Sequence, residues 1–166
     1  MLTEMGLILR PGLLDDAVVC AAIEAACFLP SEAASYEKIA RRAEAFPQGF
    51  LVAELHGEVI GFINSCAGNQ PDLSREELKD LVDHDPAGSA LVVLSVAVHP
   101  DHQGRGYSRP LLTSFIETAR HQKRQRILLL CKDHMVAYYL HFGFKDAGPS
   151  ASTHGGFQWR EMRYIL

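Results

Sequence analysis

Apolar runs alternate with turn residues along the chain, and this pattern predicts strands and helices in succession. Runs of apolar residues bounded by Gly, Pro or charged residues predict strands. Their expected ranges are 6–11, 50–55, 58–68, 91–98, 126–131, 144–148 and 159–166. A short turn containing Gly separates the second and third of these ranges, which predicts a β-hairpin.

Helical spacing of apolar residues follows the first predicted strand. Asp15 or Asp16 can cap a helix there, because a side-chain oxygen can accept from a first-turn N–H group. The apolar residues at helical spacing, expected to form its buried face, are Val18, Val19, Ala22, Ile23 and Ala26.

Capping residues mark further helices. Ser35 precedes a polar helix that reaches about Phe46, and Ser74 with Glu77 three residues later forms a capping-box pattern for a surface helix over residues 72–85. A helix with one apolar face, carrying Leu111, Leu112, Phe115, Ile116 and Ala119, follows residue 108. A short helix over 135–142 is expected to end at Gly143, a residue type favoured at helix C-termini.

The run LVVLSVAV, residues 91–98, lacks polar alternation and is rich in β-branched residues, so it predicts a central strand covered on both faces. This strand, the helix after it and the strand at 126–131 predict a parallel crossover unit. The two closing strands are expected to be antiparallel. The fold class is therefore α/β, a mixed sheet with helices on both faces.

Length and composition fit one globular domain spanning residues 1–166, with 48% hydrophobic and 22% charged residues. No stretch approaches the roughly 18 uncharged apolar residues that a membrane span needs, so no membrane association is expected. Residues 1–12 have an acidic residue at position 4 and no basic start, which does not fit a signal peptide. A cytoplasmic protein is expected.

Charge and cysteine placement restrict the classes of partner. The formal net charge is −4, which argues against a nucleic-acid partner even though residues 120–126 form a local basic run. The four cysteines, Cys20, Cys27, Cys66 and Cys131, show no CxxC pair or regular spacing. We therefore expect buried free thiols, with neither a disulfide framework nor a metal site.

The junction HPDHQGRGYSRPLL, residues 99–112, carries the strongest chemical signal. Gly104 and Gly106 allow a backbone that approaches a ligand closely, and the following helix presents free first-turn N–H groups and its positive dipole end. Such a junction binds anions. Pro110 is compatible with this role, because within the first turn it has no helical hydrogen bond to lose.

This loop matches the pattern [QR]xxGx[GA] from Gln103, except that Ser108 occupies the last place, and it resembles the pyrophosphate loop of the GNAT superfamily of acyl-CoA-dependent N-acetyltransferases. The segment YYLHFGF, residues 138–144, looks like the C-terminal signature of the same family. The resemblance implies a GNAT-type, largely antiparallel twisted sheet with a parallel strand–helix–strand core that binds acetyl-CoA.

The resemblance also implies which residues bind the co-substrate. Backbone groups of Val96, Ala97 and Val98 would meet the pantetheine arm. The pyrophosphate would be held by Gln103, Gly104, Arg105, Gly106, Tyr107, Ser108 and Arg109. Within this set, Arg105 and Arg109 can add charge-assisted contacts to phosphate oxygens.

Within the superfamily the chain is most similar to arylalkylamine N-acetyltransferases and their bacterial relatives, on stretches such as ACFLPSEAAS and LLCKD. This implies direct attack of a primary amine of a small molecule on acetyl-CoA in a ternary complex. Tyr139 matches the family tyrosine that serves as general acid, and Phe28, Pro30 and Glu32 would line the acceptor pocket. An ordinary packed loop explains these three residues at least as well.

The general base is missing from its family position. Val92 and Leu94 stand where the animal enzymes carry two histidines, and Ser95 is the only polar side chain on the strand, where an unassisted hydroxyl is a poor base. His154, in a loop of small residues, is the candidate base, although the sequence favours an exposed loop histidine without a role.

Two further hypotheses remain open for the whole chain. One is a catalytically impaired coenzyme A-binding regulatory module, and the other is an N-acetyltransferase acting on proteins or peptides. Both monomer and homodimer are compatible with the sequence.

Overall fold

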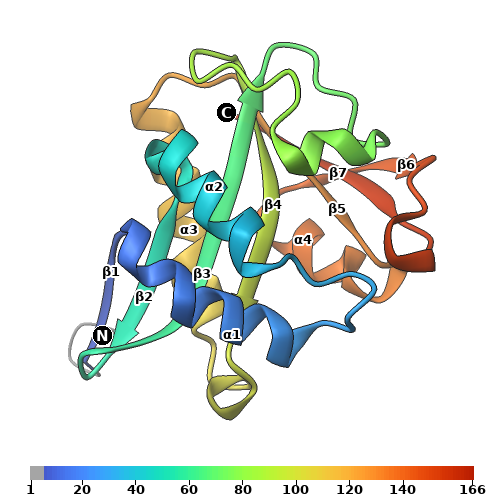
Figure 1. Ribbon diagram of the computed structural model, residues 1–166. Helices are drawn as coiled ribbons and strands as arrows, with labels where there is room; N and C mark the ends of the chain where they lie inside the picture. Colours follow the sequence, from blue (N-terminus) through green and yellow to red (C-terminus); the bar gives the residue numbers. More distant parts are fainter. Residues whose placement is uncertain (1–5) are drawn as a thin grey trace. The chain divides into compact units, whose positions relative to one another are not determined.

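The computed structural model describes residues 6–166, which form seven strands and four α-helices (Figure 1). The strands are β1 (Leu7–Pro11), β2 (Leu51–Leu55), β3 (Glu58–Gly68), β4 (Ala90–Val98), β5 (Arg126–Cys131), β6 (Lys145–Pro149) and β7 (Arg160–Ile165). The helices are α1 (Ala17–Cys27), α2 (Tyr36–Ala45), α3 (Ser108–His121) and α4 (Val136–Phe142). Every strand expected from the apolar pattern is present, with ends that differ by at most one residue.

Hydrogen bonding joins the strands in the order β1-β2-β3-β4-β5-β7-β6. The sheet is mostly antiparallel, and β4 and β5, which are connected through α3, form its parallel pair. That pair runs from Ala90 opposite Arg126 to Val92 opposite Leu128. The expected α/β fold with a parallel strand–helix–strand core and antiparallel closing strands is confirmed.

The described residues group into two compact units. The first unit comprises the chain up to Ser65 together with Ser95–Glu117, and the second comprises Cys66–Leu94 together with Thr118–Leu166. The boundaries between the units fall within β3, β4 and α3. Each of these three elements therefore continues from one unit into the other. That residues 1–166 form one domain stays a prediction.

In the first unit, α1 and α2 pack on one face of β2 and β3 and lie in front of these strands in Figure 1. The buried cluster consists of Ala17, Cys20, Ile23, Ile39, Ala43, Phe50, Val52, Phe62 and Ala97. Burying a large apolar side chain contributes about 1.5–3 kcal/mol. The cluster therefore fixes α1 firmly against the strand that leads toward the glycine loop.

The buried face of α1 differs from the expected one. Its inward residues include Cys20, Ile23 and Glu24, whereas Val18 is 68% exposed. The segment AVVCAAIEAAC is apolar on nearly every side, so apolar periodicity alone does not select a face. The face that packs inward is the one that carries the glutamate.

The N-terminus of α1 also differs in detail. Asp16 makes no side-chain cap to α1, because its carboxylate accepts from the N–H of Leu13 at 2.7 Å and pairs with Arg10 at 2.8 Å. Ser35 behaves as predicted, since its hydroxyl accepts from the N–H of Lys38 and α2 follows it directly.

In the second unit, β5 pairs with β7 along its full length, and the apolar residues Cys66, Leu73, Leu78, Ala90, Val92 and Leu128 form a buried cluster. Helix α4 ends at Gly143, whose φ of 103° is left-handed, as predicted for a C-terminal glycine. The end of α4 thereby turns directly into β6.

The expected surface helix over residues 72–85 is reduced to one short 3-10 helix, Glu76–Asp80. Ser74 does not cap it, because its hydroxyl donates to the carboxylate of Asp72 at 2.6 Å. Leu81 and Asp83 have φ values of 66° and 64°, which stop a helix from continuing. The helix predicted from the capping residues is therefore longer than the 3-10 helix that forms.

Between residues 6 and 166, no helix combines the length and apolarity that crossing a bilayer requires. The expectation that no signal peptide is present rests partly on residues 1–5, which lie outside the described residues.

Candidate functional site

The loop between β4 and α3 has the backbone that the glycine pattern predicts. One 3-10 turn, Pro100–His102, leaves the strand, and Gly104 and Gly106 then adopt left-handed φ values of 78° and 81° before α3 begins at Ser108. Residues with a Cβ pay roughly 1–2 kcal/mol in this region. Pro110 is the third residue of α3, where it has no intrahelical hydrogen bond to lose.

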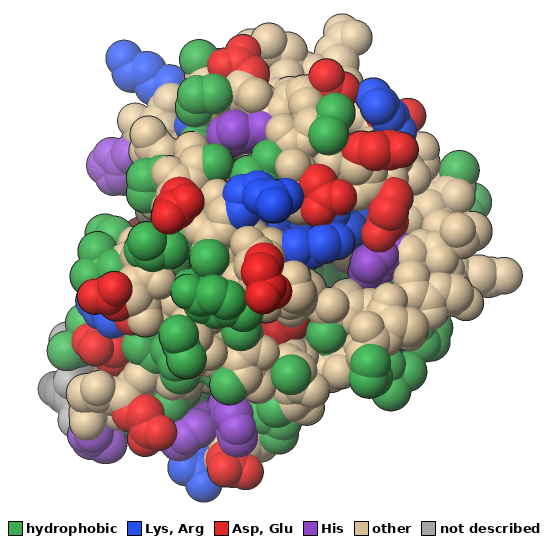
Figure 2. Space-filling view, in the orientation of Figure 1, with side chains coloured by type: hydrophobic (Ala, Val, Ile, Leu, Met, Phe, Trp, Pro, Cys, Tyr) green, Lys and Arg blue, Asp and Glu red, His purple; other side chains and the backbone are tan. Residues whose placement is uncertain are grey.

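This loop also leaves room for a ligand. A Cβ atom added at Gly104 or Gly106 would meet no heavy atom within 4 Å. Both glycines, Arg105 and Arg109 are exposed, and Figure 2 shows histidine side chains and a basic side chain at the surface over this loop. Tyr107 is instead 5% exposed, so its side chain is buried. The loop thus combines an open surface, a helix N-terminus and positive charge.

Two side chains tie the loop to the end of β4. The amide of Gln103 donates to the carbonyl of Val98 at 2.8 Å, and the thiol of Cys27 donates to the same carbonyl at 3.2 Å. Burial raises the pKa of the Cys27 thiol, which keeps its proton in place for this bond. The carbonyl of Val98 is therefore already engaged, and the side chain of Gln103 points back to the strand.

The second half of β4 lies past its pairing with β5, because that register ends at Val92. Val96, Ala97 and Val98 belong to this second half, as the sequence prediction for a pantetheine contact requires. On the other side of the strand, β3 approaches closely at Gly61, where a Cβ atom would lie 3.0 Å from the Ala97 carbonyl oxygen. A side chain at position 61 would therefore make a tight contact with β4, and its neighbours would have to shift by a few tenths of an ångström.

A buried polar cluster joins α1, α2 and β4, and it is formed by Glu24, Arg42 and Ser95. The Ser95 hydroxyl donates to Glu24 Oε2 at 3.2 Å, and Arg42 Nη1 donates to Ser95 Oγ at 3.4 Å. Glu24 Oε2 also accepts from the N–H of Ala34 at 2.8 Å. Burial raises the pKa of the Glu24 carboxyl above its ordinary value, against the opposing effects of these hydrogen bonds and of Arg42.

The sequence analysis missed Glu24 and Arg42. The available signal was a single glutamate within the otherwise apolar segment AAIEAAC, which a surface position explains equally well without a structure. From the sequence alone, Ser95 is expected to be an unassisted hydroxyl and a poor base. The fold supplies the assistance, because a carboxylate and a guanidinium both contact its hydroxyl.

The predicted acceptor residues lie in the connection between α1 and α2. Phe28 is the C-cap of α1 and packs against the first unit's core, and Pro30 is exposed. Glu32 Oε1 accepts from the N–H of Leu29 at 3.2 Å. The connection is thus an ordered, self-bonded loop, and the contribution of these three residues to an acceptor pocket stays a prediction.

In the second unit, Tyr139 is 6% exposed and packs edge-on against Tyr138 and Phe144. Within residues 6–166 its hydroxyl has no hydrogen-bond partner. Burial, with smaller contributions from Tyr138 and Cys131, raises the pKa of this phenol. The phenol therefore keeps its proton at neutral pH, as a general acid must.

His154 is not the exposed loop residue that its small neighbours suggested. Its side chain is 18% exposed, and Nδ1 lies 2.6 Å from Glu76 Oε1. The ring also faces Trp159 at 6.1 Å between centroids, and the Trp159 indole donates to the His154 carbonyl at 2.9 Å. A carboxylate that orients an imidazole in this way is compatible with a base, and equally with a structural pair.

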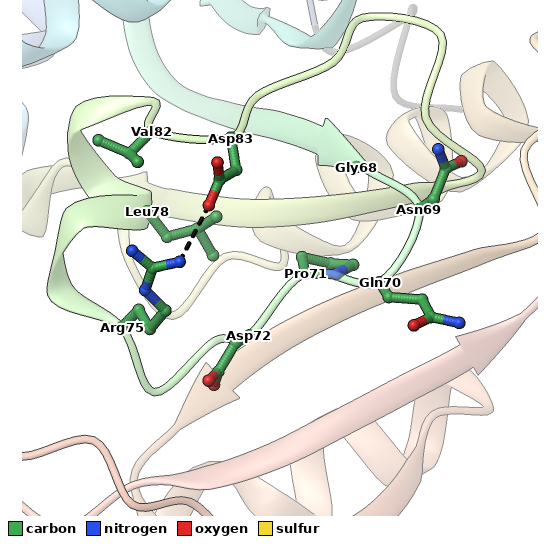
Figure 3. Close-up of a pocket in the computed structure, with 9 residues that line it drawn as sticks. All are labelled: Gly68, Asn69, Gln70, Pro71, Asp72, Arg75, Leu78, Val82 and Asp83. Carbon is green, nitrogen blue, oxygen red and sulfur yellow. Dashed lines mark hydrogen bonds and ion pairs between the residues drawn. The ribbon is translucent and has the colours of Figure 1, made fainter.

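A cavity of about 250 Å³ opens between the end of β3 and the 3-10 helix of the second unit (Figure 3). It is lined by Gly68, Asn69, Gln70, Pro71, Asp72, Arg75, Leu78, Val82 and Asp83. Arg75 and Asp83 pair at 2.9 Å beside it. Sequence reasoning did not single out this cavity, which depends on the break in the helix expected there.

Three of the four cysteines, Cys20, Cys66 and Cys131, are buried free thiols as predicted, and Cys27 is half-buried. No group of three or more His, Cys, Asp or Glu side chains in the described part of the chain is placed to hold a metal ion.

A left-handed glycine loop lies between a central strand and the N-terminus of a 14-residue helix, an arrangement that can bind an anion. The model of the acetyltransferase (GNAT) family matches residues 19–144, which include the loop and α4. The chain belongs to this family of N-acetyltransferases, and its predicted membership is confirmed.

Two mammalian serotonin N-acetyltransferases are among its relatives. The Mesocricetus auratus protein is 29% identical over 111 residues, covering 66% of this chain and 52% of that protein. The Macaca mulatta protein is 28% identical over 164 residues, covering 87% of this chain and 79% of that protein. The match to the first therefore spans about half of its length.

Solved structures share the fold at low identity. The loading GNATL domain of CurA from Lyngbya majuscula has a TM-score of 0.83 at 17% identity, with 96% of this chain and 97% of that chain covered. The structure of yncA from Salmonella typhimurium with its cofactor acetyl-CoA has a TM-score of 0.70 at 20% identity, with 96% and 94% covered. These similarities establish the fold.

Proposed function

We propose that this protein transfers the acetyl group of acetyl-CoA to the primary amine of a small molecule. The observation that carries the proposal is the open glycine loop, in which Gly104 and Gly106 adopt left-handed φ values ahead of α3. Family membership and the serotonin N-acetyltransferase relatives support an arylalkylamine-like acceptor.

The co-substrate would be held mainly by the backbone of residues 104–108, with Arg105 and Arg109 adding charge-assisted contacts to phosphate oxygens. The pantetheine arm would follow the second half of β4. Since the carbonyl of Val98 already accepts from Gln103 and Cys27, backbone groups of Val96 and Ala97 are the better candidates for this contact.

Acetyl-CoA supplies an activated thioester, and the chain must manage two protons. The acceptor ammonium loses one before it attacks, and the leaving thiolate gains one. Tyr139 is proposed as the acid, because burial keeps its phenol protonated. Two groups qualify as the base, His154 with Glu76 and Ser95 with Glu24.

Release of free thiol from acetyl-CoA, measured with and without amines, tests this proposal. The panel comprises arylalkylamines, polyamines, amino acids, aminoglycosides and short peptides, and a parallel titration measures coenzyme A affinity. We expect thiol release that depends on a small amine.

Thiol release that occurs only with peptides would indicate an enzyme that acetylates peptides instead of small amines. Coenzyme A binding without amine-dependent release anywhere in the panel would favour the regulatory module and overturn the proposal.

A further inference from the structure

We propose that Ser95 and Glu24 form a proton relay that deprotonates the acceptor ammonium, and that Arg42 positions the serine. The inference rests on the proposed acetyl transfer and assigns the base that β4 lacks at its family position. Three contacts of the first unit carry it, together with one buried carboxylate oxygen.

Geometry gives the relay its direction. Ser95 is on β4, directly before Val96, and its hydroxyl donates to Glu24 Oε2 at 3.2 Å. Arg42 Nη1 donates to the same hydroxyl oxygen at 3.4 Å, so the hydroxyl proton is directed toward the glutamate. A hydroxyl oxygen has two acceptor sites, and the second can receive a proton from an ammonium.

Glu24 has unused capacity to accept a proton. Its Oε2 accepts from Ser95 and from the N–H of Ala34, whereas its Oε1 is buried and has no hydrogen-bond partner among residues 6–166. The residue is 3% exposed. Leaving a buried carboxylate oxygen without a hydrogen-bond partner destabilises the folded state. This oxygen is therefore available to accept a proton.

The proton steps balance. One proton of the ammonium passes to Ser95 Oγ while the serine proton passes to Glu24, which yields a neutral amine, an intact serine and a neutral carboxyl group. The amine nitrogen then bonds to the acetyl carbon, and the carbon–sulfur bond breaks with its electron pair on sulfur. The acetylated nitrogen then loses a second proton, which balances the proton that converts the leaving thiolate to a thiol. Glu24 later returns its own proton to solvent.

The charges that face Glu24 set the pH at which the relay works. Burial raises the pKa of its carboxyl, nearby Glu32 raises it further, and Arg42 and the hydrogen bonds from Ala34 and Ser95 lower it. The net direction is upward. A carboxylate whose pKa is raised is a stronger base than an ordinary glutamate.

The experiment compares Ser95→Ala and Glu24→Gln with two matched controls. Ser65→Ala removes another buried hydroxyl of the first unit, one that donates to the Gly49 carbonyl at 2.9 Å. Glu54→Gln neutralises a half-buried carboxylate that pairs with Arg10. The measurements are kcat against pH, coenzyme A affinity, and thermal stability.

We expect both relay variants to lose about 10²–10⁴-fold in kcat, the usual contribution of a positioned acid or base. Coenzyme A affinity should stay within threefold, and the controls should keep their activity. The loss should shrink for acceptors of low amine pKa, which are already neutral at the assay pH. A role limited to packing would lower the rate equally for all acceptors.

Should Glu24→Gln fail to fold, Ser95→Ala decides alone. Folded relay variants with kcat within twofold of the natural chain, or a loss independent of acceptor pKa, overturn the relay while leaving the transferase intact. A loss confined to His154→Ala would likewise assign the base to His154. A natural chain that binds coenzyme A but acetylates no amine would overturn the proposed function and the relay together.

Discussion

The Cys27 thiol and the Gln103 amide converge on one acceptor, the carbonyl of Val98, at 3.2 and 2.8 Å. The end of α1 and the first residue of the glycine pattern are thereby attached to the same point of β4. Both contacts involve residues near the predicted co-substrate site, where Gln103 and Val98 are predicted to bind. The loop is therefore shaped by the chain itself before any ligand arrives.

Gln103→Ala is expected to weaken coenzyme A binding by roughly 3- to 10-fold, because a typical hydrogen bond contributes about 0.5–1.5 kcal/mol. Calorimetric titration with coenzyme A measures the change. Gln158→Ala, an exposed glutamine before β7, serves as control. Unchanged affinity in Gln103→Ala would show that the loop keeps its shape without this attachment.

Gly106→Ala is expected to lower coenzyme A affinity, since the left-handed φ of 81° costs a residue with a Cβ roughly 1–2 kcal/mol. Gly148→Ala is a matched control, because that glycine has a φ of 100°, faces open space and belongs to β6. Both variants should lose similar thermal stability. Equal losses of coenzyme A affinity in the two would argue against a specific role of the loop.

Tyr139→Phe should reduce kcat about 10²-fold or more and leave stability almost unchanged, because no hydrogen bond within the described residues is lost. Burial raises the phenol pKa, so the acid form persists well into the alkaline range in the natural chain. Tyr138→Phe removes the neighbouring hydroxyl as a control. Stopped assays of kcat from pH 6 to 10 test both, and equal activity of the two variants would remove Tyr139 from the acid role.

The Glu24 carboxyl is also expected to make the free energy of unfolding depend on pH. Its folded-state pKa lies above the ordinary value of about 4.5, so the folded state binds this proton more tightly than the unfolded state does. That contribution is complete below about pH 4.5 and is lost as the pH rises through the raised value. Relative to Glu24→Gln, the natural chain should therefore become progressively less stable on going from pH 4 to pH 8.

Denaturant unfolding of both chains at several pH values measures this difference. The ion pair of Asp16 with Arg10 has the opposite effect, because it lowers the Asp16 pKa, and its stabilisation is lost only in more acidic solution. The same Asp16 is present in both chains, so the comparison isolates Glu24. A difference that does not vary with pH would mean that the Glu24 carboxyl titrates normally.

Sequence patterns predicted the elements whose signals are local. The strands, the amphipathic α3 and the stop at Gly143 follow from side-chain periodicity and backbone sterics. The helix expected over 72–85 failed because its cap residues bond elsewhere, as Ser74 does with Asp72.

The polar cluster could not be predicted, since it depends on tertiary packing. Glu24 and Ser95 are separated by 71 residues, and Arg42 comes from a helix that looked polar and solvated. Apolar periodicity placed Ile23 correctly but wrongly placed Val18, Ala22 and Ala26 inward, because α1 is apolar on nearly every side and its buried face carries a carboxylate. Such local conflicts with the burial rule concentrate at functional sites.

The backbone N–H of Ala34 donates a hydrogen bond to Glu24 Oε2 at 2.8 Å. Any residue other than proline at position 34 would retain that donor. The side chains of the neighbouring loop can therefore change, and with them the shape of an acceptor pocket, while the loop stays fixed to α1. A scaffold of this kind can diversify its acceptors by surface substitution without disturbing the group that takes up the proton.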